Sequence, residues 1–303
     1  MKVVKRTSLV AACLASLLAQ GVAGAADVPA SPTLGKIKQA GMISIGHRTS
    51  SIPFSYYDSN QKVVGFSQDI CDRVIAQVKK ATGLPALQVR MVPVTSQNRI
   101  SLVQNGTVDL ECGVTTNLKA RQQQVAFSTT FFVAGTRLLV KKDGPVHDFA
   151  DLSGRTVVTN AGTTSERILR RLNDEKKANI TIQSAKDYGE SFLILQSGRV
   201  AAFMMDDVLL SGARTLAQNP ADWTVVGTPQ SFEAYGFMMP KDDPGFKQLV
   251  DGVMTGLMKS GEIEALYDKW FNKPVPPKGI NFEFPMSDMV RKAYANPNDQ
   301  AFE

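Results

Sequence analysis

The chain has 303 residues, of which 43% are hydrophobic and 20% are charged. This length exceeds what one compact core usually supports and favours two lobes, and the modest net charge of +6 gives no indication of a nucleic-acid partner. After the N-terminal segment, no stretch reaches the roughly eighteen consecutive apolar residues of a transmembrane helix, so we expect no membrane span in the mature chain.

The first 25 residues have the pattern of an export signal. Lysine and arginine at 2–6 precede an apolar stretch over 9–18, and small residues at 23–25 are typical of a cleavage site. Cleavage after Ala25 would remove three positive charges and no negative ones, which leaves a net charge of +3. We therefore predict a signal peptide over 1–25 and a periplasmic protein.

Strand-like and helix-like stretches then alternate, which is typical of βαβ units in an α/β protein. The first strand is predicted over 42–45, and the helix after it has an apolar face that includes Ile70 and Val74 and ends by Gly83. Further elements of this half are strands over 87–94 and 108–112 and a short helix over 98–105. The apolar run over 134–140 is predicted to leave the first lobe.

The second half repeats this alternation. Strands are predicted over 156–159, 180–183, 201–204 and 223–226, and a helix with Ser165 as its N-cap is predicted to follow the first of them. The strand over 233–239 is predicted to return to the first lobe, followed by helices over 246–258, 263–271 and 286–294. We therefore predict lobe 1 over 26–136 and 229–303, lobe 2 over 137–228, and a ligand in the cleft between them.

Cys71 and Cys112 remain after removal of the signal peptide. An exported protein meets an oxidising compartment, so the two cysteines could form a disulfide bond. Because Cys71 falls on a predicted helix and Cys112 at a strand end, two separate buried thiols are an equally good interpretation. The only histidines are His47 and His147, so we expect neither a metal site nor another cofactor.

Three arginines, Arg48, Arg99 and Arg121, lie in polar segments that each follow a predicted strand. A guanidinium pairs with a carboxylate through two parallel hydrogen bonds, and strand ends of α/β proteins are where ligands bind. A single arginine is more often a surface charge, so the prediction depends on the three together and on Asp206 at another strand end. This combination predicts a site for a small acidic amino acid.

Several blocks of the sequence are similar to periplasmic solute-binding proteins that serve ABC importers of polar amino acids, in particular to the glutamate/aspartate-binding members of that family. Their order and spacing over roughly 230 residues carry the resemblance more than any one block does. The blocks are Gly46-His47-Arg48, Pro53-Phe54-Ser55-Tyr56-Tyr57-Asp58, Thr95-Ser96-Gln97-Asn98-Arg99, Gln104-Asn105-Gly106-Thr107, Gly162-Thr163-Thr164-Ser165, Phe203-Met204-Met205-Asp206-Asp207 and Asp268-Lys269-Trp270-Phe271.

The resemblance implies the type II periplasmic-binding-protein fold, in which each of two lobes is a mostly parallel sheet flanked by helices and the ligand lies in the interlobe cleft. It also implies the residues that bind the backbone groups of an amino acid. Arg121 would bind the α-carboxylate with help from Thr116 and Thr164, and Asp206 would accept hydrogen bonds from the α-ammonium group.

The same resemblance assigns Arg48, Ser96 and Arg99 to the distal carboxylate. Two positions depart from the family pattern. Val114 stands where a serine is usual near the ammonium group, so only its backbone carbonyl can accept a hydrogen bond there. Tyr188 stands where close relatives have histidine, and its phenol can donate a hydrogen bond but brings no positive charge.

The implied function is capture of glutamate or aspartate and its delivery, by hinge closure, to the membrane permease of an ABC importer. We expect a monomer. Another polar amino acid or dicarboxylate ligand, a sensor module and a dehydratase-like enzyme are alternatives on the same fold. An enzyme would need a positioned acid or base. His47 is expected to point away from the Arg48 side and His147 to lie in an exposed turn, so we predict that the protein is not an enzyme.

Overall fold

The computed structural model describes residues 30–301, and every structural statement below concerns those residues. The predicted signal peptide over 1–25 lies outside them. The elements of the first part of the chain are α1 (Pro32–Ala40), β1 (Met42–His47), β2 (Ser50–Ser51), β3 (Ser55–Tyr57), β4 (Val63–Val64), α2 (Phe66–Thr82), β5 (Gln88–Pro93), α3 (Arg99–Gln104), β6 (Leu110–Thr116), α4 (Lys119–Gln122), β7 (Ala126–Phe127) and β8 (Phe132–Lys141).

The remaining elements begin with a short 3₁₀ helix and end with three helices in sequence. They are η1 (Phe149–Leu152), β9 (Thr156–Asn160), α5 (Thr164–Lys176), β10 (Thr181–Ala185), α6 (Tyr188–Gln196), β11 (Ala202–Asp206), α7 (Asp207–Arg214), η2 (Pro220–Asp222), β12 (Trp223–Val226), β13 (Phe232–Met239), α8 (Pro244–Ser260), α9 (Glu262–Phe271) and α10 (Asp288–Ala295).

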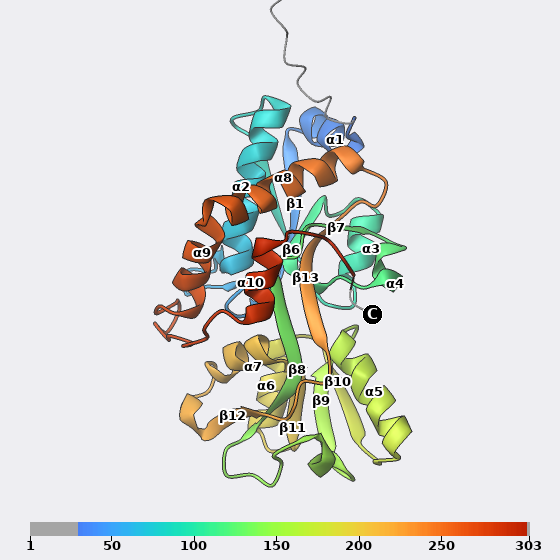
Figure 1. Ribbon diagram of the computed structural model, residues 1–303, viewed down its shortest axis with the longest axis vertical. Coiled ribbons are helices and arrows are strands. Elements are labelled where there is room, and N and C mark those ends of the chain that lie inside the picture. The colour runs from blue at the N-terminus through green and yellow to red at the C-terminus, as the bar shows by residue number, and fades with distance from the viewer. Residues whose placement is uncertain (1–29, 302–303) are drawn as a thin grey trace, which may run out of the picture.

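The strands follow one another in the order β10-β9-β11-β8-β13-β6-β1-β5, with β12 beside β8 and β7 beside β13. Pairing is parallel between β1 and its neighbours β5 and β6, and between β9 and its neighbours β10 and β11. The antiparallel pair β8 and β13 joins the two halves, and both strands run from one half into the other (Figure 1). A mostly parallel sheet in each half is as the sequence predicts.

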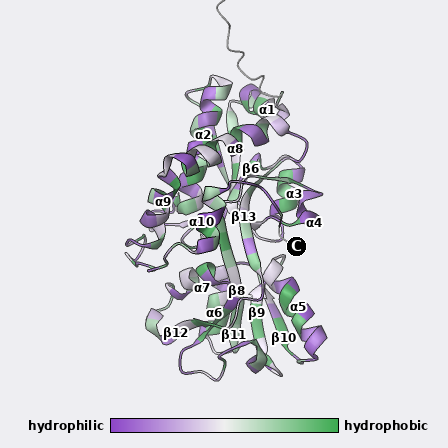
Figure 2. Cartoon of the chain, in the orientation of Figure 1, coloured by the Kyte–Doolittle hydropathy of each residue, from purple (hydrophilic) through white to green (hydrophobic). Residues whose placement is uncertain are grey.

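Helices cover both halves of the sheet. In the first half, α2 packs against α8 and β6, and α9 and α10 lie beside α8 (Figure 1). In the second half, α5 and α6 pack on β9 and β11, and α7 packs on β8 and β11. These helices carry hydrophobic and hydrophilic residues side by side (Figure 2), as expected for helices that bury one face. No helix within 30–301 has the length and apolar character that crossing a bilayer requires.

The start of α5 differs from the sequence prediction. The N-cap is Thr163 and not Ser165, because the Thr163 hydroxyl accepts a hydrogen bond from the Glu166 backbone N–H at 3.1 Å. The run of three hydroxyl residues in this segment offers three possible caps, and Thr163 has the extended backbone that an N-cap requires. Ser165 therefore lies inside the helix, where its side chain is buried.

Aromatic residues fill the centre of the first half. The ring of Phe132 on β8 lies 4.9 Å from that of Phe54 and 5.3 Å from that of Phe271, measured between centroids. The neighbouring Trp270 meets Tyr56 edge to face at 6.3 Å. The Trp270-Phe271 pair therefore packs the core of this half, and it anchors the strand that leads to the second half.

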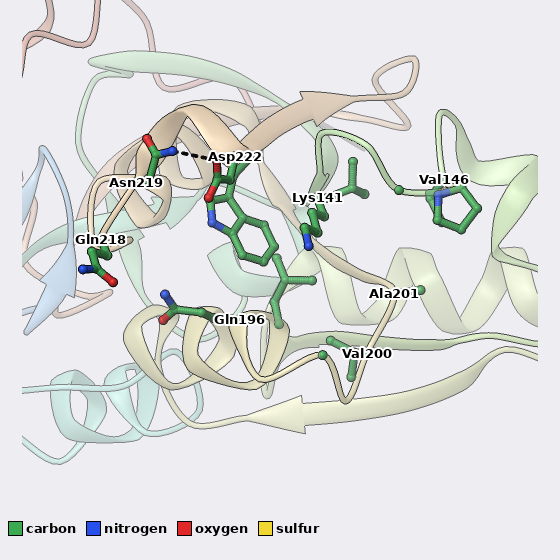
Figure 3. Close-up of a pocket in the computed structure, with 14 residues that line it drawn as sticks. Lys141, Val146, Gln196, Val200, Ala201, Gln218, Asn219 and Asp222 are labelled. Atoms are coloured by element: carbon green, nitrogen blue, oxygen red, sulfur yellow. Dashed lines mark hydrogen bonds between the residues drawn. The ribbon is translucent and has the colours of Figure 1, made fainter.

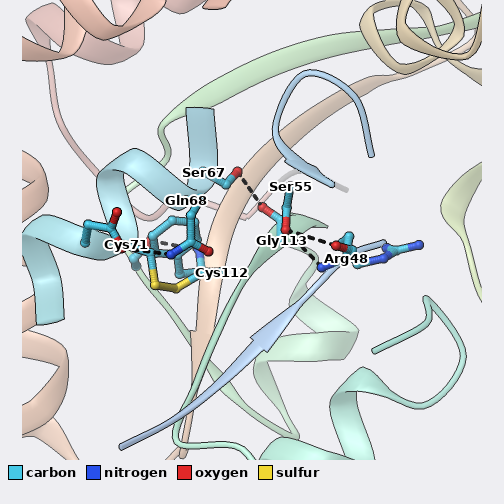
Figure 4. Close-up of a disulfide and its surroundings, with 10 residues drawn as sticks. Arg48, Ser55, Ser67, Gln68, Cys71, Cys112 and Gly113 are labelled. Atoms are coloured by element: carbon cyan, nitrogen blue, oxygen red, sulfur yellow. Dashed lines mark hydrogen bonds between the residues drawn. A yellow bond between two sulfur atoms is a disulfide. The ribbon is translucent and has the colours of Figure 1, made fainter. Parts of the chain in front are cut away.

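Cys71 of α2 and Cys112 of β6 form a disulfide bond, with 6.0 Å between their Cα atoms (Figure 4). This bond decides between the two interpretations that the sequence leaves open. Cys112 lies inside β6 and not at a strand end as predicted, and its contact with α2 arises only when distant parts of the chain pack together. The bond fixes α2 to the strand that leads to the predicted site.

Candidate ligand-binding site

Two of the predicted arginines lie together at one end of the site. Arg48 follows β1 and Arg99 begins α3, and each is only 2% exposed. The Cζ atom of Arg48 lies 4.9 Å from the centroid of the Tyr188 ring, which is a cation–π arrangement. Tyr188 is the first residue of α6, so this contact connects the two halves of the molecule.

Several hydrogen-bond donors at this end have no partner among the described residues. They are Nη1 of Arg48, Nε of Arg99 and the hydroxyl of Ser96, all of them buried. The Nη1 atom of Arg99 does have a partner, since it donates to the backbone carbonyl of Val114 at 3.0 Å. Buried donors without partners are unfavourable and rare. Donors that lack partners within 30–301 are available to an anionic ligand group.

Arg121 of α4 lies at a junction between the halves. It donates to the carbonyl of Thr116 at 2.9 Å and to the carbonyl of Gly162 at 3.3 Å. Burial, and then the positive charge of Arg99, lower the pKa of Arg121 to about 9. Thr116 at the end of β6 and Thr164 at the start of α5 are both buried beside this region.

The loop between β9 and α5 packs directly on the segment before α3. Gly162 in this loop has φ +78°, and a Cβ atom there would lie 2.8 Å from the Cα of Gln97 and 3.0 Å from the carbonyl oxygen of Ser96. Only glycine combines this backbone conformation with such a close approach. The two halves are therefore in direct contact beside the arginines.

Asp206 ends β11 and is buried at the strands that join the halves. Its carboxylate accepts hydrogen bonds from the Tyr235 hydroxyl, from the Thr136 hydroxyl at 3.3 Å and from the Ser165 hydroxyl at 3.5 Å. Burial, and then the nearby negative charge of Glu233, raise the pKa of Asp206 to about 8. No cation forms an ion pair with Asp206 among the described residues.

Three buried residues near the predicted site are missed by the sequence reasoning: Glu111, Glu233 and Tyr235. Glu111 and Glu233 each lie in a strand whose other residues are mostly apolar. A carboxylate inside an apolar strand is the signal that could have found them, since such a group is seldom buried without a partner. Tyr235 gives no comparable signal, because a tyrosine is common in a buried strand.

Four of the predicted site residues, Arg48, Arg99, Arg121 and Tyr188, lie close to one another. Arg99 interacts electrostatically with Arg48 and Tyr188, and Arg121 interacts with Arg99. A separate cavity of about 470 Å³ lies in the second half, where Lys141, Gln196 and Asp222 line it (Figure 3). None of the predicted site residues lines that cavity.

Comparison with known proteins places the chain in a family. The family model for bacterial extracellular solute-binding proteins, family 3, matches residues 43–273. The chain is 54% identical over 292 residues to the "Glutamate/aspartate import solute-binding protein" of Escherichia coli (strain K12), covering 96% of this chain and 97% of that one. It is 55% identical over 272 residues to the "L-glutamate/L-aspartate-binding protein" of Pseudomonas aeruginosa, covering 89% and 90%.

A solved structure supports the same fold. The crystal structure of the ancestral amino acid-binding protein AncCDT-1, a precursor of cyclohexadienyl dehydratase, has a TM-score of 0.67 and 28% identity, and the match covers 79% of this chain and 100% of that one. The predicted two-lobe, type II α/β fold is confirmed. By its sequence and its fold, the chain belongs to the bacterial extracellular solute-binding proteins, family 3.

Proposed function

We propose that this protein captures glutamate or aspartate outside the cytoplasm and delivers it to the membrane permease of an ABC importer. The observation that carries the proposal is that buried donor atoms of Arg48, Ser96 and Arg99 have no partner among the described residues, and that the Asp206 carboxylate is also buried. The names of the two relatives that are more than half identical to the chain agree with this choice of ligand.

At the backbone end of the ligand, Arg121 binds the α-carboxylate, and the hydroxyls of Thr116 and Thr164 complete its hydrogen bonds. Asp206 binds the α-ammonium group. The support is that Arg121 already bonds to a carbonyl of each half, so its guanidinium is fixed between them. The Val114 carbonyl, the other candidate for the ammonium group, already accepts one hydrogen bond from Arg99 and has one lone pair left.

At the other end, Arg48, Arg99 and Ser96 bind the distal carboxylate. The position of Tyr188 supports a role different from the one that its hydroxyl suggests in the sequence. Its ring lies against the Arg48 guanidinium, so Tyr188 holds that arginine in the orientation that meets the ligand.

The ligand closes a hinge between the lobes. We assign lobe 1 to residues 26–136 and 229–303 and lobe 2 to 137–228, because the chain passes between the halves only through β8 and the segment that enters β13. The C-terminal segment belongs to lobe 1, since the backbone carbonyl of Asp299 accepts a hydrogen bond from the Asn117 side chain at 2.8 Å. The export pattern over 1–25 supports a periplasmic location.

Binding without chemistry is favoured over a dehydratase-like enzyme. Burial lowers the pKa of His47, its Nδ1 lies 3.0 Å from the carbonyl oxygen of Arg48, and its ring packs edge to face against Tyr57. The His47 imidazole therefore packs in the interior and is a poor candidate for a catalytic acid or base. Asp206 is held by three hydroxyls and has a sufficient role in binding an ammonium group.

Calorimetric titration with glutamate, aspartate, glutamine and asparagine tests the proposal. Glutamate and aspartate should bind, and glutamine should bind about a hundredfold more weakly, because an amide brings no negative charge to the buried guanidinium groups. Arg48→Gln and Arg99→Gln should each weaken glutamate binding, by about 1.5–3 kcal/mol for each hydrogen bond to a charged group that is lost. Arg73→Gln is the control, since Arg73 pairs with Glu262 at the surface. Equal affinities for glutamate and glutamine would contradict the proposal.

A further inference from the structure

Glu111 is a buried carboxylate that the proposed ligand contacts do not use. It lies in β6, has 0% exposure and forms no ion pair among the described residues. Its Oε2 accepts a hydrogen bond from the Thr115 hydroxyl at 2.9 Å, whereas its Oε1 is buried without a partner. An ionised group in such a place is unfavourable unless nearby positive charge compensates it.

The backbone leaves space for this side chain beside the distal end of the site. A Cβ atom on Gly113 would lie 2.0 Å from Oε1 of Glu111 and 3.1 Å from Cγ of Arg48, so only a glycine separates the two side chains. Gly113 lies next to Arg48 in Figure 4. On the other side, a Cβ atom on Gly46 would lie 3.4 Å from Cγ of Glu111. Glu111 is therefore held close to Arg48 by the shape of β1 and β6.

Burial raises the pKa of Glu111, and the positive charges of Arg99 and Arg48 act against that rise and favour the ionised carboxylate. Two guanidinium groups that are buried side by side repel each other, and a distal ligand carboxylate brings only one negative charge. Glu111 supplies the second negative charge without contacting the ligand. With Arg48, Arg99 and Glu111 counted together, the distal end of the site carries one net positive charge, which one carboxylate neutralises.

We propose that Glu111 is the internal counter-ion of the distal subsite and a specificity-determining residue, because its negative charge offsets one of the two guanidinium charges and so limits the preference for a distal carboxylate over a neutral amide. The inference rests on the proposed function and deepens it. Its consequence is unusual for a buried residue near a site: removal of the Glu111 charge should strengthen the binding of an acidic ligand, since the subsite then carries two positive charges.

Glu111→Gln tests the direction of this change in affinity, because a glutamine side chain has nearly the same shape as glutamate and no charge. Glutamate should bind at least about fivefold more tightly than to the parent protein, and its preference over glutamine should widen by a similar factor. Asp251→Asn is the matched control, since Asp251 is a partly buried carboxylate that bonds to Thr129 and Lys247 away from the arginines. This control should bind glutamate as the parent does.

A second comparison tests the same charge balance with one arginine removed. Arg48→Gln leaves Arg99 and Glu111, which together carry no net charge, and it should bind glutamate weakly. Adding Glu111→Gln restores one positive charge, so the double variant should bind glutamate at least about tenfold more tightly than Arg48→Gln does. If Glu111 only packed the core, the double variant would bind glutamate no more tightly than Arg48→Gln does.

The results distinguish a failure of the proposed function from a failure of the proposed role of Glu111. If the parent protein does not bind glutamate, the proposed function fails. If the parent binds glutamate, but Glu111→Gln leaves its affinity unchanged or weaker and the double variant is no better than Arg48→Gln, the proposed function stands and the role of Glu111 as a counter-ion is overturned.

Discussion

The Tyr188 ring faces the Arg48 guanidinium at 4.9 Å, and this contact predicts which atoms of Tyr188 matter. Tyr188→Phe keeps an aromatic face under the guanidinium, so glutamate affinity should stay close to that of the parent. Tyr188→Leu removes the face and should weaken binding by about 0.5–2 kcal/mol. Calorimetry on both variants gives the comparison. If the phenylalanine variant lost as much affinity as the leucine variant, the hydroxyl and not the ring would be the contributing group.

The buried carboxylate of Asp206 predicts a pH dependence of binding. Burial and the charge of Glu233 raise the pKa of Asp206 to about 8, so at pH 6 the group is protonated and cannot pair with an ammonium group as an anion. Other groups that face Asp206 are Tyr235, which donates to it, and the neighbouring Asp207, whose charge also raises its pKa. Glutamate affinity should therefore rise between pH 6 and pH 8.

Calorimetry in two buffers of different ionisation enthalpy checks this prediction, because binding near pH 7 should release a proton from Asp206. Glu233→Gln is the informative variant. Loss of the second carboxylate should lower the pKa of Asp206 and move the pH dependence to lower pH. An affinity that is constant from pH 6 to pH 8, with a buffer-independent enthalpy, would show that Asp206 is already ionised without ligand.

At the scale of the elements, the contact between the β9–α5 loop and the segment before α3 depends on one glycine. Gly162→Ala should weaken glutamate binding by about tenfold or more, because the new Cβ would lie 2.8 Å from the backbone of Gln97 and push the loop away from Arg121. Gly198→Ala is the matched control, since Gly198 also has a positive φ, +74°, but a Cβ atom added there would have no neighbouring atom within 4 Å. Equal affinity losses in the two variants would assign the effect to backbone strain alone.

The order of the elements could be predicted from the sequence to a large extent, because hydrophobic periodicity and turn residues are local. The apolar face of α2 and its end at Gly83 are examples. Contacts between distant segments could not be predicted in this way. The disulfide depends on α2 packing against β6, and the position of Tyr235 depends on its pairing with Thr116 across the β13–β6 ladder. The N-cap of α5 differs from the prediction because three successive hydroxyl residues compete for it.

The arginines at strand ends can be found from the sequence because the polar segments that contain them follow apolar strands. The carboxylates that balance them cannot be found in this way. Glu111 and Glu233 lie within strands, and their nearness to Arg99, Arg121 and Asp206 exists only after the sheet has formed. The charge of the site is therefore a property of the folded sheet more than of any one motif.

At the scale of the whole molecule, the proposed ligand-binding residues come from both halves, so ligand should stabilise the closed arrangement. Small-angle scattering should show a smaller radius of gyration when glutamate is added at saturating concentration. Glutamine at the same concentration serves as the control, since it lacks the distal carboxylate. No change in the radius of gyration with glutamate, in a sample that calorimetry shows to be saturated, would argue against hinge closure.

The path of the chain through the sheet also has a consequence for how the protein is assembled. The strand β6 of the first half pairs with β13, and their register joins Thr116 to Tyr235 across the whole of the intervening second half. The residues between 137 and 228 can form their contacts within one continuous segment. The first half cannot complete its sheet and its helical cover until β13, α8 and α9, which follow residue 228, have been synthesised. Contacts between distant segments form slowly. During synthesis from the N-terminus, the part of the chain that is made first is therefore the part that completes its contacts last.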